Sequence, residues 1–566
     1  MHALSDTEPL APAPSKRWLL VTLGAVFILS FPSLRYPLGR DQATQCVMAS
    51  GLLHGRQLYR DLWDNRPPGI FYLYTVFVLL FGRVMWLAGV VDLLWLVAID
   101  YFIFRFGKRY LGAPAGMLAA VLYTLLHERA GFESAAQPEC FIVLFVFLAD
   151  SLLMARQRRW PEARSFVAGI LFGAAFWMKY NAGLFILLGM VLPFWDASGL
   201  DERPGRWRLN VPWKKWFERT AFLALGFGAA VVIPIAYFVH VGAWPALVQA
   251  QFEVLPRYGL MVLSRQQDYF VWMLTAIHWN LRGWVEASVA IALALAWRRR
   301  ELSRLAPVLF AAFIGFMVTV SQLNFHSYYF ETCLPFLAMI VAYAGVALFK
   351  EFQTLAGKLR ERKMGLAQVL VWLVFANIIY FPLPGLAMIL RRETKGLVAW
   401  VRDPKASYRH YAWPDPNEHL RGQLQVIRYL KANAGAGDQV FVWGTAPLIY
   451  FMTGKQPPNR FVSNLGLMAA WGPAAWRREL VRDLRQSLPR FIVVARHDAV
   501  YGITYTHLDS AQYLARYPGL ARILRRHYRE VVPGRNFIIY RRRSSRATAQ
   551  AFLRGWGSLK RLEGRI

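Results

Sequence analysis

Long apolar segments recur through the first 390 residues of the chain and are separated by shorter polar loops. A helix needs about 20 mostly apolar residues to cross a hydrocarbon core about 30 Å thick. The pattern therefore predicts a polytopic α-helical membrane protein with about eleven transmembrane helices. The predicted spans are residues 17–36, 84–106, 111–127, 138–155, 165–179, 181–195, 220–240, 270–297, 304–322, 326–349 and 366–390.

The apolar stretch of residues 69–81 is too short to cross a membrane comfortably, so we expect an interfacial or half-buried helix there. With this stretch outside the count, every loop on the side of the N-terminus is basic, as the positive-inside rule predicts for cytoplasmic loops. These loops are residues 108–109, 156–159, 203–219, 298–304 and 350–363. We therefore expect a multi-pass membrane protein with a cytoplasmic N-terminus and an extracytoplasmic C-terminal region.

The C-terminal region has a different pattern, in which helical periodicity alternates with short apolar runs. Helices are predicted at residues 420–432 and 473–487, and strands at 439–443, 491–495 and 537–540. The sequence thus predicts two domains. They are a transmembrane domain of residues 1–390, with a first outer loop of residues 37–83, and an α/β domain of residues 391–566. The basic tail of the second domain, residues 541–565, is a candidate for contact with anionic lipid headgroups.

Composition agrees with a membrane protein and excludes several other classes. Hydrophobic residues make up 56% of the chain and charged residues only 18%, which excludes intrinsic disorder. The formal net charge is +32. The basic residues gather in loops and form no nucleic-acid-binding motif, so no nucleic acid is expected as a partner. The three cysteines, Cys46, Cys140 and Cys333, are scattered and imply neither a disulfide nor a zinc framework.

Charged and polar side chains are concentrated in the first outer loop, directly after the first predicted span. Asp41 lies close to the expected hydrocarbon edge, where a carboxylate is costly and is usually functional or paired. Arg40 and Arg66 are possible partners, so an ordinary interfacial ion pair explains Asp41 as well as a functional site does. Residues 59–68 continue the loop as Tyr-Arg-Asp-Leu-Trp-Asp-Asn-Arg-Pro-Pro and run into the aromatic stretch of residues 69–81.

This loop resembles the first outer loop of the GT-C superfamily of polyprenyl-phosphate-sugar-dependent glycosyltransferases. The likeness is greatest to the branch that holds bacterial protein O-mannosyltransferase-like enzymes, lipid A aminoarabinose transferases and rhizobial lipopolysaccharide transferases. That branch has an acid after the first span and, about twenty residues later, a block similar to residues 59–68. Similar family stretches are residues 137–139, 179–181, 328–331 with Pro335, and 437–444 with Pro447, Tyr450 and Gly454.

The chain also departs from the family pattern at three positions. Many members carry two adjacent acids in the first loop, but Asp41 is followed by Gln42. Arg66 stands where lysine is commoner, and its planar guanidinium group can still bind a phosphate. Tyr328 stands where histidine is usual, and His326 lies two residues earlier, which leaves the roles of both open.

The resemblance implies a protein of the bacterial inner membrane that transfers a sugar from a polyprenyl phosphate to an acceptor hydroxyl on the outer face. Inversion at the anomeric carbon would follow from a single displacement. The acceptor can be lipid A, lipopolysaccharide, another glycan or a protein. Asp41 is then the catalytic base, because a carboxylate near the attacking hydroxyl can take its proton. The candidate ligands of the donor phosphate are Arg66, Lys179, Arg257, Arg265 and His326. The candidate supporting acids are Asp64, Glu139 and Glu331.

Simpler interpretations stay open for several of these residues. Arg257 and Arg265 are also explained by long basic side chains that reach toward lipid headgroups. Glu139 is also explained as an acid at a helix N-terminus, where the helix dipole favours negative charge.

No cofactor is expected, and a divalent metal is possible but not favoured. Some GT-C relatives hold a divalent ion with acids from two outer loops, and the absent second acid after Asp41 argues against a metal here. His127, Glu128 and Glu133 keep that question open. The chain has no glycine-rich phosphate loop, so the expected donor is a lipid-linked sugar rather than a soluble nucleotide sugar.

Two alternatives come from other functional classes. One is a transporter or flippase for a lipid-linked or anionic solute, and the other is a non-catalytic scaffold in envelope assembly. A transporter explains the spans and the basic outer loops. It does not explain the charged first loop or a folded outer tail, since alternating access needs neither.

Overall fold

Contacts within the computed structural model divide the chain into two compact units. The helical unit comprises residues 1–38, 66–245 and 255–407, and the α/β unit comprises residues 39–65, 246–254 and 408–566. The structure describes residues 16–154, 160–197, 213–265, 268–360, 382–409 and 419–543.

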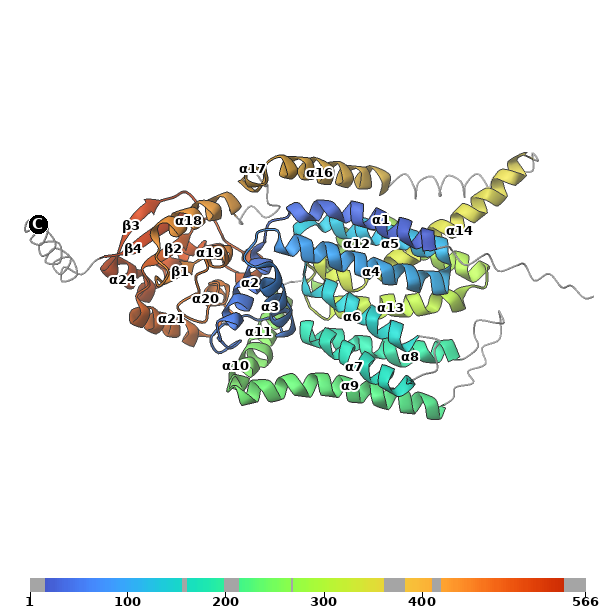
Figure 1. The fold of residues 1–566 in the computed structure, drawn as a ribbon, viewed down its shortest axis with the longest axis horizontal. Helices are drawn as coiled ribbons and strands as arrows, with labels where there is room; N and C mark the ends of the chain where they lie inside the picture. Colours follow the sequence, from blue (N-terminus) through green and yellow to red (C-terminus); the bar gives the residue numbers. More distant parts are fainter. Residues whose placement is uncertain are drawn as a thin grey trace, which may run out of the picture. The chain divides into compact units, whose positions relative to one another are not determined.

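Long helices build the helical unit (Figure 1). They are α1 (Lys16–Ser30), α3 (Gly69–Phe81), α4 (Leu87–Leu111), α5 (Ala113–Ala130), α6 (Pro138–Leu153), α7 (Pro161–Met178), α8 (Ile186–Ala197), α9 (Trp213–His240), α11 (Leu255–Arg265), α12 (Tyr269–Arg298), α13 (Leu302–Val320), α14 (Leu334–Arg360), α16 (Pro382–Arg402) and α17 (Pro404–Arg409). Short 3₁₀ segments connect them: η1 (Phe31–Arg35), η2 (Gly131–Glu133), η3 (Tyr180–Phe185) and η5 (Ser327–Thr332).

Proline and glycine explain much of how these helices begin and pack. Pro138 and Pro161 stand at the first position of α6 and α7, where the missing N–H has no helical partner to lose. Gly226 of α9 faces the backbone of α7 so closely that a Cβ there would lie 1.9 Å from the Phe166 carbonyl oxygen. Small residues that bring two backbones together are typical of helix pairs in membranes.

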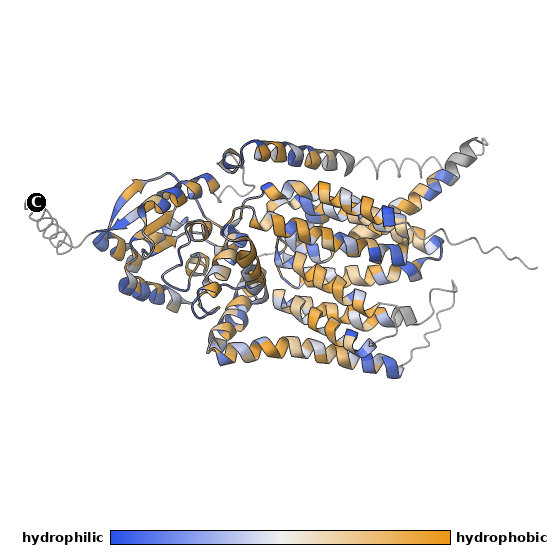
Figure 2. Cartoon of the chain, in the orientation of Figure 1, coloured by the Kyte–Doolittle hydropathy of each residue, from blue (hydrophilic) through white to orange (hydrophobic). Residues whose placement is uncertain are grey.

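The predicted fold class is confirmed: the chain is a polytopic α-helical membrane protein with a small C-terminal α/β region. The first ten predicted spans coincide with helices over most of their length. Figure 2 shows hydrophobic positions along α9 and hydrophilic ones at its beginning, as expected for a spanning helix with a basic end.

The number of spans stays a prediction. Within the described residues, five helical segments are long and apolar enough to cross a membrane: residues 16–35, 87–111, 213–240, 302–320 and 334–354. Others are shorter, such as α6 with 16 residues. The eleventh predicted span, residues 366–390, lies largely outside the described residues, and its last part begins the amphipathic helix α16.

The loops on the expected outer side contain more structure than the sequence predicted. The predicted helix at residues 69–81 is confirmed as α3 with the same bounds. The preceding part of the loop forms a further helix, α2 (Arg40–Leu53), which was not predicted because its apolar residues are diluted by polar ones. The loop after α9 contains α10 (Trp244–Val248) and the π-helix η4 (Gln249–Val254). The predicted span at 326–349 begins with η5, and its α-helix starts only at Leu334.

The α/β unit is built on a mixed four-stranded sheet in the order β1-β2-β4-β3. Strands β1 (Val440–Trp443) and β2 (Phe491–Ala495) are parallel, whereas β4 (Phe537–Arg542) is antiparallel to both β2 and β3 (Tyr528–Pro533). The helices of this unit are α18 (Leu420–Asn433), α19 (Leu448–Thr453), α20 (Leu465–Met468), α21 (Ala474–Ser487), α22 (Tyr501–Thr504), α23 (Ser510–Ala515) and α24 (Pro518–His527).

The three predicted strands and both predicted helices of this unit are confirmed, but β3 was not predicted. This strand is at the edge of the sheet, is partly exposed, and has a register shift between Glu530 and Val532. It also ends on Pro533, which an edge strand tolerates because it need not donate every backbone hydrogen bond. Because a partly exposed edge strand needs fewer buried apolar residues, the sequence of β3 lacks the apolar run that predicted β1 and β2.

Part of the first outer loop belongs to the core of the α/β unit. The Trp63 ring lies among Phe461, Trp471 and Trp476, with ring centroids 6.4, 6.4 and 4.5 Å away. The Trp63 backbone N–H donates to the Arg460 carbonyl at 2.7 Å, and the Arg56 guanidinium donates to carbonyls of the same segment. The tryptophan of the 59–68 motif thus has a structural role that its sequence position alone did not reveal.

Replacing Trp63 with alanine is expected to lower the free energy of unfolding of the α/β unit by about 3–5 kcal/mol, since a large buried ring is lost. Limited proteolysis of the full-length protein during heating measures this effect. Cleavage within residues 419–543 should begin at a lower temperature in the variant than in wild type. Trp160→Ala is the matched control, because Trp160 is 75% exposed and its loss should change stability by less than about 0.5 kcal/mol. Equal cleavage of the two variants would contradict a structural role for Trp63.

Candidate active site

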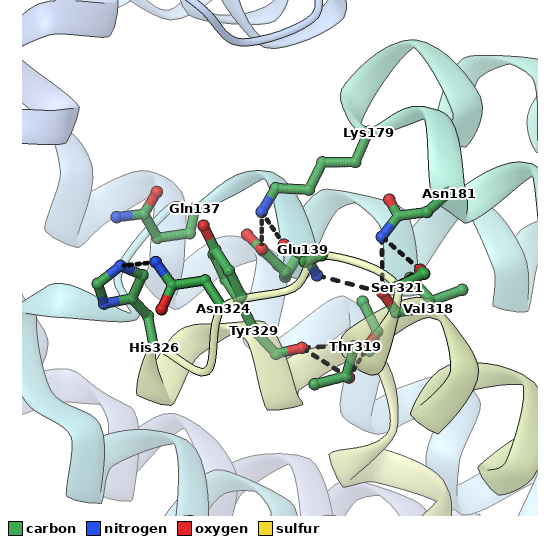
Figure 3. Close-up of polar contacts among 12 residues, drawn as sticks. Gln137, Glu139, Lys179, Asn181, Val318, Thr319, Ser321, Asn324, His326 and Tyr329 are labelled. Atoms are coloured by element: carbon green, nitrogen blue, oxygen red, sulfur yellow. Dashed lines mark hydrogen bonds and ion pairs between the residues drawn. The ribbon is translucent and has the colours of Figure 1, made fainter. Parts of the chain in front are cut away.

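A lysine at a break between two helices is the centre of the candidate site. Helix α7 ends at Met178, and Lys179 has extended backbone angles of φ −153° and ψ 131° before η3 begins. This break turns the Lys179 side chain away from the helix axis and toward α6 and the segment that follows α13 (Figure 3). Its ammonium pairs with the Glu139 carboxylate and donates to Oε1 of Gln322.

Glu139 is a fully buried acid in the first turn of α6. Its Oε1 atom accepts the Lys179 ammonium, and its Oε2 atom has no hydrogen bond from any described residue. Removing one partner from a buried ion pair leaves an uncompensated charge in a medium of low dielectric. The Lys179–Glu139 pair is therefore held together more firmly than a pair on the protein surface.

Asn181 and Gln322 connect the helix break to the end of α13. The Asn181 amide donates to the Val318 carbonyl at 2.6 Å and to the Ser321 hydroxyl at 3.1 Å. Gln322 lies in the turn that follows α13 and accepts from Lys179. These bonds fix the ammonium against two separate parts of the chain.

Aromatic rings form one wall of the site. The Lys179 nitrogen lies 3.8 Å from the centroid of the Tyr329 ring and 5.9 Å from that of Tyr328, which are cation–π distances. His326 stacks on Tyr328 with an interplanar angle of 2°, and its Nε2 atom lies 3.1 Å from the Asn324 amide. Tyr328 and His326, which mark one departure from the family pattern, thus lie side by side, with Tyr328 next to Lys179.

The proline-proline block of the first outer loop packs against the same end of α7. Gly69 begins α3 directly after Pro68, and a Cβ on Gly69 would lie 2.6 Å from the Trp177 carbonyl oxygen. Trp177 is two residues before Lys179. Glycine at this position therefore allows the segment that carries Arg66 to approach the helix break.

Gly69→Ala tests this approach. The added methyl group must push α3 away from α7, and such overpacking typically costs about 1–3 kcal/mol. We expect a lower melting temperature and weaker activity. Gly24→Ala in α1 is the matched control, because no atom lies within 4 Å of its new Cβ. Thermal unfolding in detergent measures the melting temperature of the two purified variants. A Gly69→Ala variant with an unchanged melting temperature would show that the close packing is dispensable.

The other predicted site residues lie in several places. Asp41 is in the first turn of α2 and Asp64 follows the buried Trp63, so both belong to segments of the α/β unit. Arg66 begins the next segment of the helical unit. Arg257 is an exposed residue of α11, and Arg265 ends that helix. Glu331 is buried in η5, where its Oε1 atom lies 3.0 Å from Nδ1 of His127.

Some residues of the site had no sequence signal. Gln322 is one polar residue in a polar turn, and nothing in the sequence connects it to Lys179, 143 positions earlier. Tyr329 was noted only as part of a motif, whereas the structure shows its ring against the ammonium. His127 was considered for metal binding, and the structure surrounds it with Glu331 and Asp92.

Comparison with known proteins supports one family. Residues 65–203 match the sequence model of the family described as dolichyl-phosphate-mannose-protein mannosyltransferase. This segment includes Arg66, Glu139 and Lys179. A search of curated protein sequences found no match.

Solved structures with similar folds include two membrane proteins. ArnT from Cupriavidus metallidurans, solved with undecaprenyl phosphate, is 14% identical over 94% of this chain and 99% of its own, with a TM-score of 0.49. The oligosaccharyltransferase of Archaeoglobus fulgidus, tethered to an acceptor peptide, is 12% identical over 94% of this chain and 74% of its own, with a TM-score of 0.48.

The family match covers the segment that holds the Lys179–Glu139 pair, and the motif of the first outer loop resembles the one found in the GT-C superfamily. Both apply to a chain whose fold is that of a multi-pass membrane protein with a C-terminal α/β region. Residues 65–203 of the chain are therefore similar to the dolichyl-phosphate-mannose-protein mannosyltransferase family.

Proposed function

We propose that the chain is a membrane glycosyltransferase that moves a sugar from a polyprenyl-phosphate donor to an acceptor hydroxyl on the outer face of the bacterial inner membrane. The observation that carries the proposal is the half-buried Lys179 ammonium, held by the buried Glu139, by Gln322 and by the Tyr329 ring. It lies in the segment that matches a family named for a lipid-phosphate-linked sugar. The acceptor is a glycan, a lipid or a protein.

The leaving group of this reaction is a lipid phosphate, so positive charge near the phosphate stabilises the transition state. The Lys179–Glu139 pair has no net charge and therefore cannot supply all of it. Arg66 is the proposed main phosphate ligand, since its guanidinium can bind two phosphate oxygens at once. Lys179 orients the phosphate, and Arg257 and His326 are further candidates on the same unit.

An acceptor hydroxyl must lose its proton as it attacks the anomeric carbon. We assign this proton to Asp41, which the family pattern places after the first span. A single displacement by that hydroxyl inverts the configuration of the sugar carbon. Asp64 and Glu139 orient the cations, and the transfer step uses no cofactor, because Arg66 and Lys179 supply the charge.

Reconstitution into proteoliposomes tests this proposal. The purified protein receives a panel of radiolabelled polyprenyl-phosphate sugars together with an envelope extract as the acceptor source. Loss of label from one donor and its appearance in a larger product would support the proposal and would identify the sugar. If every donor stays intact while labelled lipid crosses the bilayer, the transporter is the correct function.

A further inference from the structure

A second set of buried polar groups lies in the helical unit and has no part in the proposed transfer. It consists of Asp92 on α4, His127 on α5 and Cys140 on α6, each 1% exposed. One nitrogen, oxygen or sulfur atom from each residue lies within 4.8 Å of those from the other two. These three atom types are the ordinary protein ligands of zinc.

The histidine of this cluster is oriented as a metal ligand would be. Its Nε2 atom lies 3.1 Å from Oδ2 of Asp92, and its Nδ1 atom lies 3.0 Å from Oε1 of Glu331. A metal-bound histidine usually donates its other ring N–H to a carboxylate, which fixes the ring. Glu331 can accept that hydrogen bond, and the Ala136 backbone N–H holds Asp92 through Oδ1 at 2.9 Å.

The spacing also fits an ion. Zinc binds nitrogen and carboxylate oxygen at about 2.0–2.2 Å, so two such ligands at a tetrahedral centre are about 3.3 Å apart. The observed separation of 3.1 Å between His127 and Asp92 needs only a small adjustment. The Cys140 thiol donates a weak hydrogen bond to the Ser134 carbonyl at 3.5 Å and also interacts with the His127 ring, so its sulfur already lies toward the proposed ion.

Unsatisfied polar atoms near the cluster are a separate observation. Oε2 of Glu331 and Oγ of Ser134 are buried, and neither atom has a hydrogen bond within the described part of the chain. The buried hydroxyl of Tyr123, whose ring centroid is 6.2 Å from that of His127, is in the same situation. Buried polar groups of this kind usually mark a bound ion or water.

We propose that Asp92, His127 and Cys140 bind one structural zinc ion, with Glu331 holding Nδ1–H of His127. The mixture of thiolate, imidazole and carboxylate ligands favours zinc over magnesium or calcium. The fourth ligand is a water molecule. This proposal concerns metal binding alone and does not depend on the proposed sugar transfer.

The ion would connect three helices and η5 next to the candidate active site. Cys140 directly follows Glu139, and Glu331 is two residues after Tyr329. Glu139 and Tyr329 both contact the Lys179 ammonium. The zinc ion would thus keep two walls of the Lys179 site at a fixed separation without contacting the substrate.

Metal analysis of the purified, tag-free full-length protein tests this inference. Cells are grown with added zinc, and the metal content of wild type, Cys140→Ala and Cys333→Ala is compared. Cys333 is the matched control, because its thiol is also buried and free. We expect about one zinc per chain in wild type and Cys333→Ala, and at least about a tenfold loss in Cys140→Ala.

X-ray absorption at the zinc edge of the wild-type protein supplies a measurement that needs no variant. It should show one sulfur neighbour at about 2.3 Å together with nitrogen and oxygen neighbours at about 2.0–2.2 Å. Wild-type protein without stoichiometric zinc would overturn the inference. So would a zinc spectrum without sulfur, or full zinc content in Cys140→Ala.

Discussion

The Asp41→Asn variant should transfer sugar about 100- to 10,000-fold more slowly than wild type, the range expected when a general base is lost. Asparagine keeps the shape of the side chain in the first turn of α2 but cannot take a proton from the acceptor. The variant should still bind donor lipid, since the proposed phosphate ligands are unchanged. Initial rates over a range of donor concentrations should therefore show a lower kcat with little change in KM.

Asp61→Asn is the matched control in the same loop. Although partial burial opposes its ionisation, hydrogen bonds from Arg60 and the Gln57 backbone N–H lower the pKa of Asp61. Its charge thus serves local loop structure, and Asp61→Asn should retain most of the transfer rate. If Asp41→Asn is as active as Asp61→Asn, Asp41 is an interfacial ion-pair residue and not the base.

Replacing Lys179 with methionine is expected to have a large effect on both stability and activity. Glu139 is completely buried and would lose its cation, which typically costs about 3–5 kcal/mol. The double variant Lys179→Met with Glu139→Gln has no buried charge at this position, so it should recover much of the lost stability. It should not recover transfer, because the ammonium beside the donor phosphate is still missing.

Thermal unfolding and transfer rates of the two single variants and the double variant measure these expectations. Comparison of the stability and the transfer rate of each variant separates the structural role of the pair from its role in the reaction. An active double variant would mean that Lys179 only balances the charge of Glu139. A single Lys179→Met variant with wild-type stability would contradict the strong coupling that burial predicts.

The lengths of the apolar segments predicted the membrane part of the fold, because each such segment can be recognised from its own residues alone. The bounds of α3 follow from an apolar run between Pro68 and Gly82, and β2 follows from five buried apolar residues. Helix α2 and strand β3 were missed for the opposite reason, since contacts from other parts of the chain stabilise them. Trp63 shows this most clearly, because its partners are about 400 residues away.

The candidate site was predictable as separate motifs but not as an arrangement. Lys179 and Glu139 each stood out next to a helix end, while their pairing across 40 residues needed the structure. Glu331 was expected as a supporting acid of the site, and its nearest described partner is His127. Asp92, His127 and Cys140 lie on three different helices, so no spacing rule for metal ligands applies to them.

The central claim is that the sugar leaves its lipid phosphate and joins an acceptor. A donor that carries tritium in the sugar and carbon-14 in the polyprenyl chain tests it directly, in proteoliposomes with wild type and Asp41→Asn. Wild type should move tritium to the acceptor and leave carbon-14 as polyprenyl phosphate, whereas Asp41→Asn should leave both labels together. If both labels stay on one intact molecule in wild-type vesicles, the protein does not catalyse this transfer.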